Sequence, residues 1–271
     1  MIKHDFHLHT NHSNDSETPM EQMIERGIEL GLSAMCFTEH MDMDFPRTET
    51  DTPSFEVNTD AYHAELCMLK EKYKKQINIL FGVELGLQPH LVQRHKDYVN
   101  HYPFDFIIGS SHIAEGLDPF YPSYYEGRTE DEAYQAYFED ELNNIRLFHT
   151  YDIYGHLDYI VRYGPNKNQF YTYQKFSDII DEILRELISR GKGIEVNTGG
   201  LKYGLGHPNP TEDIIKRYHE LGGEIITIGS DAHIPQYVAY EFARMESILQ
   251  QSGFRYYTVF ENRKASFIKL D

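Results

Sequence analysis

The sequence predicts an α/β fold in which seven parallel strands alternate with helices and close, or nearly close, into a barrel. Three observations favour this fold. Seven short apolar runs recur along the chain, segments with helix signals separate most of them, and 271 residues fit one α/β barrel of about 200–250 residues with its loops. We find no internal repeat, low-complexity tract or Ser/Gly linker, so we expect a single domain over residues 1–271. An open doubly wound sheet is the alternative.

The predicted strands are short, apolar and rich in β-branched residues, and most are followed by a helical segment. Successive strand-then-helix units build a parallel sheet with right-handed crossovers. The seven runs are Ile2–Leu8, Leu32–Phe37, Ile77–Leu85, Phe104–Ile108, Ile153–Tyr154, Gly193–Val196 and Glu224–Ile228.

Three of the intervening helices carry a start signal, and a fourth, Gln174–Arg190, is predicted by its apolar periodicity and ends before Gly191. Thr18 with Glu21, and Thr129 with Glu132, have the spacing of a capping box, and Pro19 suits the first helical position. Glycine suits the position after a helix, where the backbone turns left-handed. The expected helices run from Thr18-Pro19-Met20-Glu21 to Gly31, from Thr129 to about His149, over Gln174–Arg190 before Gly191, and from Asn209-Pro210-Thr211-Glu212 to Gly222-Gly223.

The charge balance argues against several classes of partner. Acidic residues exceed basic ones by 43 to 25, and the formal charge of −18 repels nucleic-acid phosphates and anionic membrane surfaces. The basic cluster within residues 70–75 falls in a helix-like stretch, and we interpret it as a solvated face. We therefore expect a small-molecule partner, not a nucleic acid or a membrane.

Hydropathy and cysteine content favour a cytoplasmic protein. The mean hydropathy of −0.56 and the lack of an 18-residue apolar run exclude a transmembrane helix. The first five residues already carry charge and do not begin a signal peptide. The two cysteines, Cys36 and Cys67, are too few for a disulfide scaffold or a thiolate zinc site.

Fifteen histidines against 25 lysines and arginines point toward metal chemistry, although scattered surface histidines would give the same count. Position decides between the two, because functional residues of such a barrel lie at the C-terminal ends of its strands. Six of the seven predicted strands end in His, Glu or Asp. The ends are His7-Leu8-His9, Thr38-Glu39-His40, Gly82-Val83-Glu84, Ser110-Ser111-His112, Gly155-His156-Leu157-Asp158, Val196-Asn197 and Gly229-Ser230-Asp231-Ala232-His233.

Strand geometry explains the spacing of these residues. Residues two apart face the same side of a strand, so His7 and His9 can reach one ion, and Asp231 and His233 repeat the spacing. Imidazole and carboxylate ligands together suit divalent zinc, iron or manganese. The candidates outnumber the needs of one ion, which indicates two or three ions with Glu84 as a bridge. We expect no metal role for the nine other histidines.

At these residues the chain resembles the polymerase and histidinol phosphatase (PHP) superfamily. The likeness runs in order through His7-x-His9, Thr38-Glu39-His40, Glu84, His112, His156 and Asp231-x-His233 and spans nearly the whole chain. Length and the stretch around Asp5-Phe6-His7-Leu8-His9-Thr10 are most similar to the stand-alone histidinol-phosphate phosphatases. The resemblance implies a distorted (β/α)7 TIM-like barrel with a three-metal site.

The resemblance also implies which residues bind each ion. Some relatives have histidine where this chain has Asp15, and a role for Asp15 as a turn or cap residue stays open. By position, the first ion is assigned His7, His9, Glu84 and Asp231, the second Asp15, His40 and His233, and the third Glu84, His112 and His156.

The implied reaction is the hydrolysis of a phosphomonoester, L-histidinol phosphate, to L-histidinol and phosphate in histidine biosynthesis. We expect a metal-bound hydroxide to attack phosphorus in line. Arg162, shortly after His156, is the candidate for a bidentate grip on phosphate, with a surface ion pair as the alternative. Asp231 or His233 is expected to pass a proton to the leaving alkoxide.

Substrate choice is expected to lie in four long loops rich in aromatic and acidic residues, which suit a ligand with an amine and an imidazole. Asp42 and Glu115 are the candidate partners of those groups, and His207 is a further candidate phosphate donor. The loops are Met41–Asn58, Glu115–Arg128, Arg162–Tyr173 and Gly199–Asn209.

Two alternative functions stay open. One is a PHP-type protein-tyrosine phosphatase or another small-molecule phosphoesterase, because the acidic charge disfavours only the exonucleases among the relatives. The other is a non-catalytic metal-binding PHP module.

Overall fold

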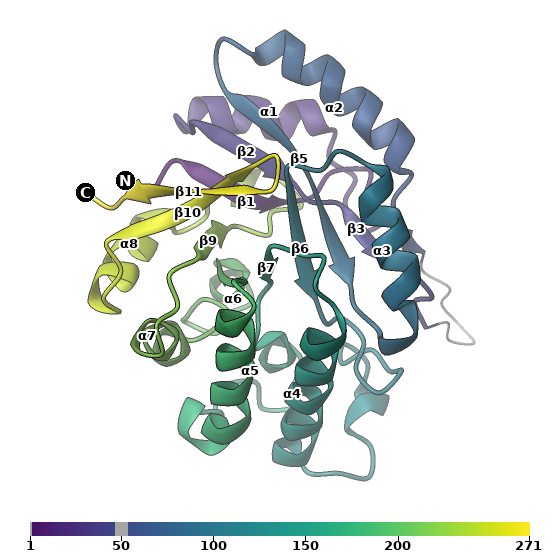
Figure 1. Ribbon diagram of the computed structural model, residues 1–271, viewed down its shortest axis with the longest axis vertical. Coiled ribbons are helices and arrows are strands. Elements are labelled where there is room, and N and C mark those ends of the chain that lie inside the picture. Colours follow the sequence, from purple (N-terminus) through teal and green to yellow (C-terminus); the bar gives the residue numbers. More distant parts are fainter. Residues whose placement is uncertain (1, 47–53) are drawn as a thin grey trace.

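Seven parallel strands form the core of the computed structural model, which describes residues 2–46 and 54–271 (Figure 1). Their order in the sheet is β1-β2-β5-β6-β7-β8-β9, which is also their order along the chain. All seven predicted strands are confirmed. They are β1 (His4–Leu8), β2 (Ala34–Phe37), β5 (Asn78–Gly86), β6 (Phe106–Ser110), β7 (Ile153–Tyr154), β8 (Gly193–Asn197) and β9 (Ile226–Gly229).

The sheet curves until its first and last strands meet. Leu8 forms a parallel bridge with Ala232, and the N–H of His9 donates to the carbonyl oxygen of Ala232 at 2.9 Å. The N–H of Asp231 donates to the carbonyl oxygen of His7, also at 2.9 Å. The predicted barrel is therefore confirmed as nearly closed, and the open-sheet alternative is wrong.

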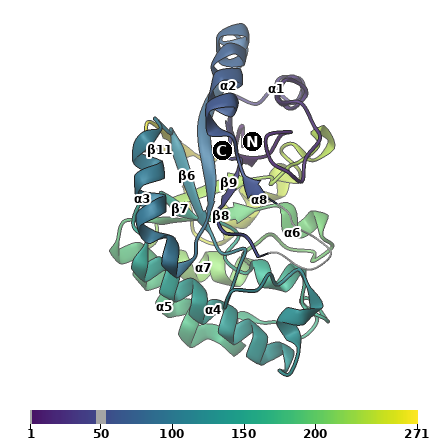
Figure 2. The same ribbon diagram turned by 90° about the vertical axis from the view of Figure 1, so that its right-hand side faces the viewer.

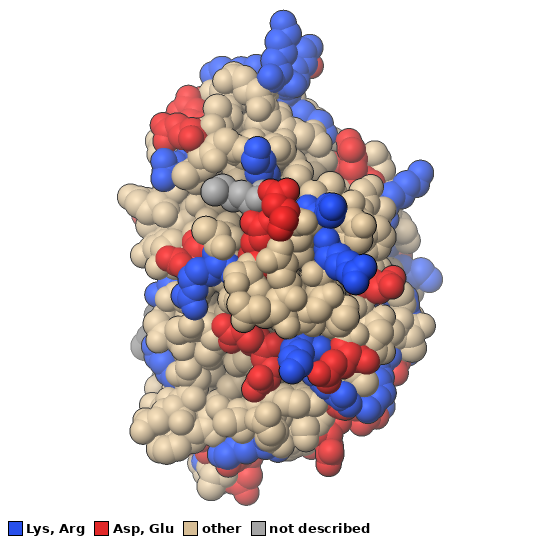
Figure 3. Space-filling model, turned by 90° about the vertical axis from the view of Figure 1, so that its left-hand side faces the viewer, with Lys and Arg blue, Asp and Glu red and all other residues tan. Residues whose placement is uncertain are grey.

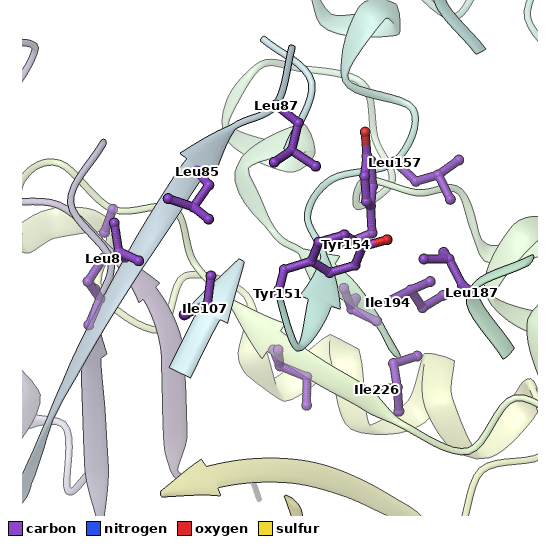
Figure 4. Packing of buried hydrophobic residues seen from close by; sticks show 14 of the residues in the cluster. Leu8, Leu85, Leu87, Ile107, Tyr151, Tyr154, Leu157, Leu187, Ile194 and Ile226 are labelled. Carbon is purple, nitrogen blue, oxygen red and sulfur yellow. The ribbon is translucent and has the colours of Figure 1, made fainter. Parts of the chain in front are cut away.

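Helices cover the outer face of the barrel, and α4 and α5 lie side by side (Figure 2). Figure 4 shows apolar side chains of the strands, among them Leu85, Ile107 and Ile194, in the same packed layer as Leu187 of α5. The four predicted helices are present. The helices are α1 (Met20–Glu29), α2 (Thr59–Tyr73), α3 (Val92–His101), α4 (Glu130–Leu147), α5 (Ser177–Ser189), α6 (Gly199–Lys202), α7 (Glu212–Glu220) and α8 (Phe242–Gln251).

One predicted capping box is confirmed and the other is wrong. At the start of α4, the N–H of Glu132 donates to the Thr129 hydroxyl and the Glu132 carboxylate accepts the Thr129 N–H. At α1, Pro19 is the N-cap residue and makes no side-chain cap. The Thr18 hydroxyl donates instead to the carbonyl oxygen of His233 at 2.9 Å, so tertiary bonding competes successfully with the local cap.

A short strand that the sequence did not predict positions one of the histidines. β3 (His40–Asp42) pairs with β4 (Phe55–Glu56) in antiparallel fashion and with β5 in parallel fashion. In the second pairing His40 stands opposite Glu84. Residues 47–53 of the predicted loop Met41–Asn58 lie outside the described residues.

The end of the barrel away from the C-terminal strand ends is filled with apolar side chains. Phe6 and Phe106 pack edge to face, with ring centroids 5.3 Å apart. Phe260, 5.1 Å from Phe106, comes from a C-terminal hairpin that the sequence also did not predict. The hairpin consists of β10 (Tyr256–Glu261) and β11 (Lys264–Lys269), and Figure 1 shows it beside β1.

The surface carries charges of both signs. On the face that Figure 3 shows, lysine and arginine side chains are interspersed with aspartate and glutamate side chains and do not form one basic patch. None of the helices described for residues 2–46 and 54–271 is both long and apolar enough to span a bilayer.

Candidate metal centre

The nine predicted metal ligands gather at the C-terminal end of the barrel. We call this group the candidate metal centre. His7, His9 and Glu84 have no exposed surface, whereas His40 and His233 keep 12% and 20% of their side chains exposed. The centre is therefore buried on one side and accessible on the other. Its members are His7, His9, Asp15, His40, Glu84, His112, His156, Asp231 and His233.

Glu84 lies in the middle of the candidate metal centre. Its Oε2 atom is 3.1 Å from Nε2 of His7, 3.5 Å from Nε2 of His9 and 3.1 Å from Nδ1 of His40. Although it is buried, this oxygen has no hydrogen-bond partner among the described residues. An oxygen ringed by nitrogen ligands and left without a hydrogen bond fits the coordination of a cation.

The other oxygen of Glu84 faces two further imidazoles. Oε1 lies 2.9 Å from Nε2 of His156 and 3.2 Å from Nε2 of His112, and it accepts the Ser110 hydroxyl at 2.7 Å. The two histidine nitrogens are 3.4 Å apart. Glu84 thus joins two groups of imidazoles through its two oxygens, the arrangement expected of a bridging carboxylate.

The donor atoms are close enough for shared cations. In each of three overlapping trios, the ligand atoms lie within 4.8 Å of one another. Histidine nitrogen and carboxylate oxygen are the ligands of zinc, iron and manganese, so these residues fit such ions. The trios are His7, His9 and Glu84; His40, Glu84 and His112; and His9, His40 and His233.

Asp15 faces the exposed side of the candidate metal centre. Its Oδ2 atom lies 3.1 Å from Nε2 of His233 and 3.5 Å from Nε2 of His40. Burial opposes its ionisation, but the two imidazoles outweigh burial and hold the pKa of Asp15 well below its usual range. The carboxylate of Asp15 therefore faces the two histidine nitrogens with which it would share an ion. The residue itself lies in a turn.

Charges of both signs balance within the candidate metal centre. Burial lowers the pKa of His7, but carboxylates, Glu195 foremost, raise it well above its ordinary value. Burial opposes ionisation of Glu84, but imidazoles, His7 foremost, hold its pKa well below its usual range. Burial and then the charge of His40 lower the pKa of His9, which keeps that ring neutral. A divalent cation can replace the imidazolium protons in this balance.

Both carboxylate oxygens of Asp42 face imidazoles of the candidate metal centre. Its Oδ1 atom lies 2.6 Å from Nδ1 of His112, and Oδ2 lies 3.4 Å from Nδ1 of His40. The hydrogen bond fixes the tautomer of His112 with Nε2 toward Glu84. This position favours an orienting role for Asp42 behind His112. Asp42 also lines the cavity, so its predicted contact with substrate stays a prediction.

Glu195 is an orienting residue that the sequence argument missed. It is buried on β8, and its Oε1 atom lies 2.7 Å from Nδ1 of His7. Its Oε2 atom accepts the backbone N–H of His156 at 3.0 Å and the amide of Asn197 at 3.0 Å. A carboxylate inside the apolar run Gly193–Val196 was the signal that could have identified it.

Arg162 lies beside the candidate metal centre, in a 3-10 turn (Tyr159–Arg162), and is buried. It donates from Nε to Asn209 at 2.8 Å, from NH1 to Asp231 at 2.9 Å and from NH2 to Asn197 at 2.8 Å. The alternative of a surface ion pair is therefore wrong. Three of its five N–H groups are used, and two remain for a ligand.

A cavity of about 330 Å³ opens above the candidate metal centre. Arg162 and members of the centre form part of its wall, and aromatic side chains form much of the rest. The predicted aromatic and acidic rim is therefore present. The aromatic members are Phe45, Phe55, Phe120, Tyr121, Tyr159, Tyr163 and Tyr203, and the acidic member beyond those already described is Asp118.

Two predicted substrate contacts do not lie at this cavity. Glu115 is half-exposed, pairs with Arg128 and does not line this cavity, and the backbone is left-handed at Glu115 and Gly116. His207 lines a separate hollow with Tyr171, and its Nδ1 donates to the carbonyl oxygen of Pro208 at 2.7 Å. The predictions for Glu115 and His207 are therefore wrong in position.

The structure is a nearly closed parallel barrel that gathers imidazoles and carboxylates, a ligand set able to hold metal ions, at its C-terminal strand ends. A family model described as "PHP domain" matches residues 5–199. The chain belongs to the PHP domain family, which confirms the resemblance.

The relatives share nearly the full length of the chain. A histidinol-phosphatase from Lactococcus lactis subsp. lactis is 30% identical over 269 residues, which are 97% of this chain and 96% of that protein. A "Probable histidinol-phosphatase" from Clostridium acetobutylicum is 34% identical over 238 residues, 88% and 89% of the two chains.

Solved structures agree with the fold. The crystal structure of histidinol phosphate phosphatase from Lactococcus lactis, complexed with zinc, L-histidinol and phosphate, superposes with a TM-score of 0.88 at 30% identity and covers 97% of this chain and 98% of that one. A structure from Listeria monocytogenes superposes with a TM-score of 0.78 at 22% identity, covering 89% and 99%, and supports the barrel fold.

Proposed function

We propose that this chain is a metal-dependent phosphomonoesterase that hydrolyses L-histidinol phosphate to L-histidinol and phosphate. The observation that supports this function most directly is a single cavity lined by members of the candidate metal centre, by Arg162 and by aromatic and acidic side chains. The likeness over 97% of the chain to a phosphatase structure that holds zinc, L-histidinol and phosphate supports this substrate.

We propose two to three divalent ions, zinc, manganese or iron, as the cofactors. When bound, such ions lower the pKa of a coordinated water and neutralise phosphoryl oxygens. Glu84 would bridge two ions, since each of its oxygens faces different imidazoles. The proposed ligand sets are His7, His9, Glu84 and Asp231; Asp15, His40 and His233; and Glu84, His112 and His156.

Arg162 is proposed to bind the phosphoryl group. Its bonds to Asn197, Asn209 and Asp231 fix the plane of the guanidinium at the cavity wall. The two remaining N–H groups are then preorganised to donate to phosphoryl oxygens, which needs no rearrangement during the reaction.

Protonation of the leaving alkoxide is proposed for His233 in preference to Asp231. Burial opposes ionisation of Asp231, but His7 and then Arg162 hold its pKa well below the usual range, which makes it a poor proton donor. His233 bonds through Nδ1 to the carbonyl oxygen of Asp231 at 3.0 Å, so its Nε2 faces Asp15 and the cavity. It can donate a proton from Nε2 only in a state in which this nitrogen does not bind an ion, so the donor role and the ligand role proposed for His233 exclude each other at any one moment.

The experiment compares three substrates with purified, metal-loaded protein: histidinol phosphate, a phosphotyrosine peptide and a nucleotide. We expect kcat/KM for histidinol phosphate to exceed the other two by at least about a hundredfold. A preference for the peptide would favour the tyrosine phosphatase. No turnover of any of the three with zinc, manganese or iron would favour a non-catalytic module.

A further inference from the structure

We propose that Asp118 binds a cationic nitrogen of the substrate's leaving group and so selects phosphate esters of amino alcohols. The inference rests on the proposed function and adds a specificity residue to it. Asp118 follows the strand end of β6 in the loop Glu115–Arg128 and lines the cavity above the candidate metal centre.

Asp118 differs from the other carboxylates of the cavity wall in having no cationic partner among the described residues. Its Oδ1 atom accepts the backbone N–H of Phe120 at 2.8 Å. The other carboxylates each face a nitrogen of a charged or chargeable side chain. These pairs are Asp15 with His233 at 3.1 Å, Asp42 with His112 at 2.6 Å, Glu84 with His156 at 2.9 Å and Asp231 with Arg162 at 2.9 Å.

The surroundings make an unpaired charge at Asp118 unfavourable. Burial, the largest effect, raises the pKa of Asp118 to about 6, and the hydrogen bond from Phe120 only partly opposes it. A carboxylate that is partly desolvated and lacks a counter-ion gains from binding a cation. At neutral pH the group is largely ionised, and a substrate ammonium or imidazolium would supply a cation in direct contact with it.

An aromatic wall leads from Asp118 to the reacting end of the cavity. Phe120, which is 58% exposed at the rim, packs on Tyr163 with ring centroids 5.5 Å apart. Tyr163 packs on Tyr159 at 5.0 Å, and Tyr159 on the metal-centre residue His156 at 4.9 Å. Such faces attract cations and stack on flat rings, so the wall guides a cationic heteroaromatic group toward Asp118.

The charge distribution separates the two ends of the ligand. Arg162 and the metal ligands stand where a phosphoryl group would bind, and Asp118 lines the same cavity without a direct contact to them, since His112 and Asp42 act on it only through space. An anionic phosphate at one end and a cationic nitrogen at the other would therefore each meet the opposite charge.

The test compares Asp118→Asn with the parent protein, both metal-loaded, on histidinol phosphate and on p-nitrophenyl phosphate, which has no cationic nitrogen. We expect kcat/KM for histidinol phosphate to fall about thirtyfold or more, chiefly through KM, and that for p-nitrophenyl phosphate to change less than about threefold. Inhibition by L-histidinol should weaken to a similar extent, whereas inhibition by inorganic phosphate should not change.

Glu126→Gln is the matched control, because Glu126 is an exposed carboxylate of the same loop that does not line the cavity. It should leave all four measurements unchanged. Equal losses on both substrates, or no loss on histidinol phosphate, would overturn the role of Asp118. If the parent protein failed to hydrolyse histidinol phosphate, the proposed function would fail first, and L-histidinol binding would still test Asp118.

Discussion

Arg162 and Asp231 form a buried ion pair at the edge of the candidate metal centre, with NH1 of Arg162 2.9 Å from Oδ2 of Asp231. The other oxygen of Asp231 faces the centre, 3.7 Å from Nε2 of His9. One carboxylate thus links the proposed phosphate ligand to a proposed metal ligand. Substitution at either residue is expected to affect both functions.

Arg162→Ala should lower kcat/KM about a hundredfold or more, equivalent to about 3 kcal/mol of transition-state stabilisation. It should also weaken inhibition by phosphate and lower metal affinity, since Asp231 loses the partner that orients it. Arg162→Lys should recover only part of the lost kcat/KM, because an ammonium group lacks the planar, forked donors of a guanidinium. Steady-state kinetics and elemental analysis measure these effects. Unchanged phosphate inhibition in Arg162→Ala would show that the guanidinium does not contact phosphate.

Glu84→Gln should lose both metal and turnover. The neutral amide cannot neutralise two cations and offers one oxygen in place of two, so we expect the loss of at least one metal equivalent and a fall in kcat of roughly a thousandfold. Elemental analysis and kinetics at saturating substrate provide the measurements, with Glu126→Gln as control. If Glu84→Gln kept its full metal content and a near-normal kcat, Glu84 would be a buried, paired carboxylate without a role as a bridging ligand.

Asp42→Asn and Glu195→Gln should each weaken metal binding by about 10–100-fold while the barrel stays folded. Each variant removes the charged acceptor behind an imidazole, His112 or His7, so that the ring loses its fixed tautomer. Competition with a metal-sensitive chelator measures the affinity, and circular dichroism checks the fold. Wild-type affinity in both variants would mean that the rings are oriented by packing alone.

Metal removal should abolish activity. We expect protein as isolated to carry more than one equivalent of transition metal, and dialysis against a chelator to stop turnover until zinc, manganese or iron is restored. Dialysis without chelator is the control. Activity that survived the loss of all metal would rule out the candidate metal centre as the catalytic site.

His95 should make the protein less stable in acid. The side chain is fully buried, its Nε2 donates to the carbonyl oxygen of Gly86, and burial lowers its pKa from 6.5 to about 4. Between these values the unfolded chain binds the proton and the folded chain does not. The stability from neutral His95 is thus complete above about pH 6.5 and lost as the pH falls toward 4, by about 3 kcal/mol.

Urea unfolding from pH 7 to pH 4 measures this loss. His95→Gln should be less stable at pH 7 and should show a shallower decline, whereas His101→Gln, at an exposed position, should follow the parent protein. Equal slopes for parent and His95→Gln would show that other groups cause the acid dependence.

The strand ends could be predicted because parallel strands deliver their C-terminal residues to one edge whatever the loops do. That His7 and His9 face the same side could also be predicted, because side chains two residues apart along a strand point the same way. His40 lies with the other predicted ligands. Its strand β3 was not expected, because three residues are too few to show a pattern. The hairpin that carries Phe260 was missed because β11 is almost entirely exposed and shows no buried apolar run.

Which loop residues line the cavity could not be predicted as well as the strand ends. Glu115 and Asp118 are three residues apart in one loop, and only Asp118 lines the cavity. The left-handed backbone at Glu115 and Gly116 is not readable from composition or periodicity. Two partners of Arg162 come from other strand ends, Asn197 of β8 and Asp231 after β9, and Asn209 lies in the loop before α7, so the burial of Arg162 depends on tertiary structure. Glu195 is the opposite case, because a carboxylate in the middle of an apolar strand is visible in the sequence. It was missed because only the residues at the strand ends were considered.

The closure between Leu8 and Ala232 has a consequence for how the protein is assembled during synthesis. His7 and His9 leave the ribosome with the first strand, whereas Asp231 follows only after the last one. A growing chain therefore carries half of a metal site, and the first proposed ion can be fully bound only once the ring of strands is complete. Contacts this distant in sequence form slowly. Once bound, the ion would join the two strands whose separation opens the barrel, so that unfolding from this side would first require metal release.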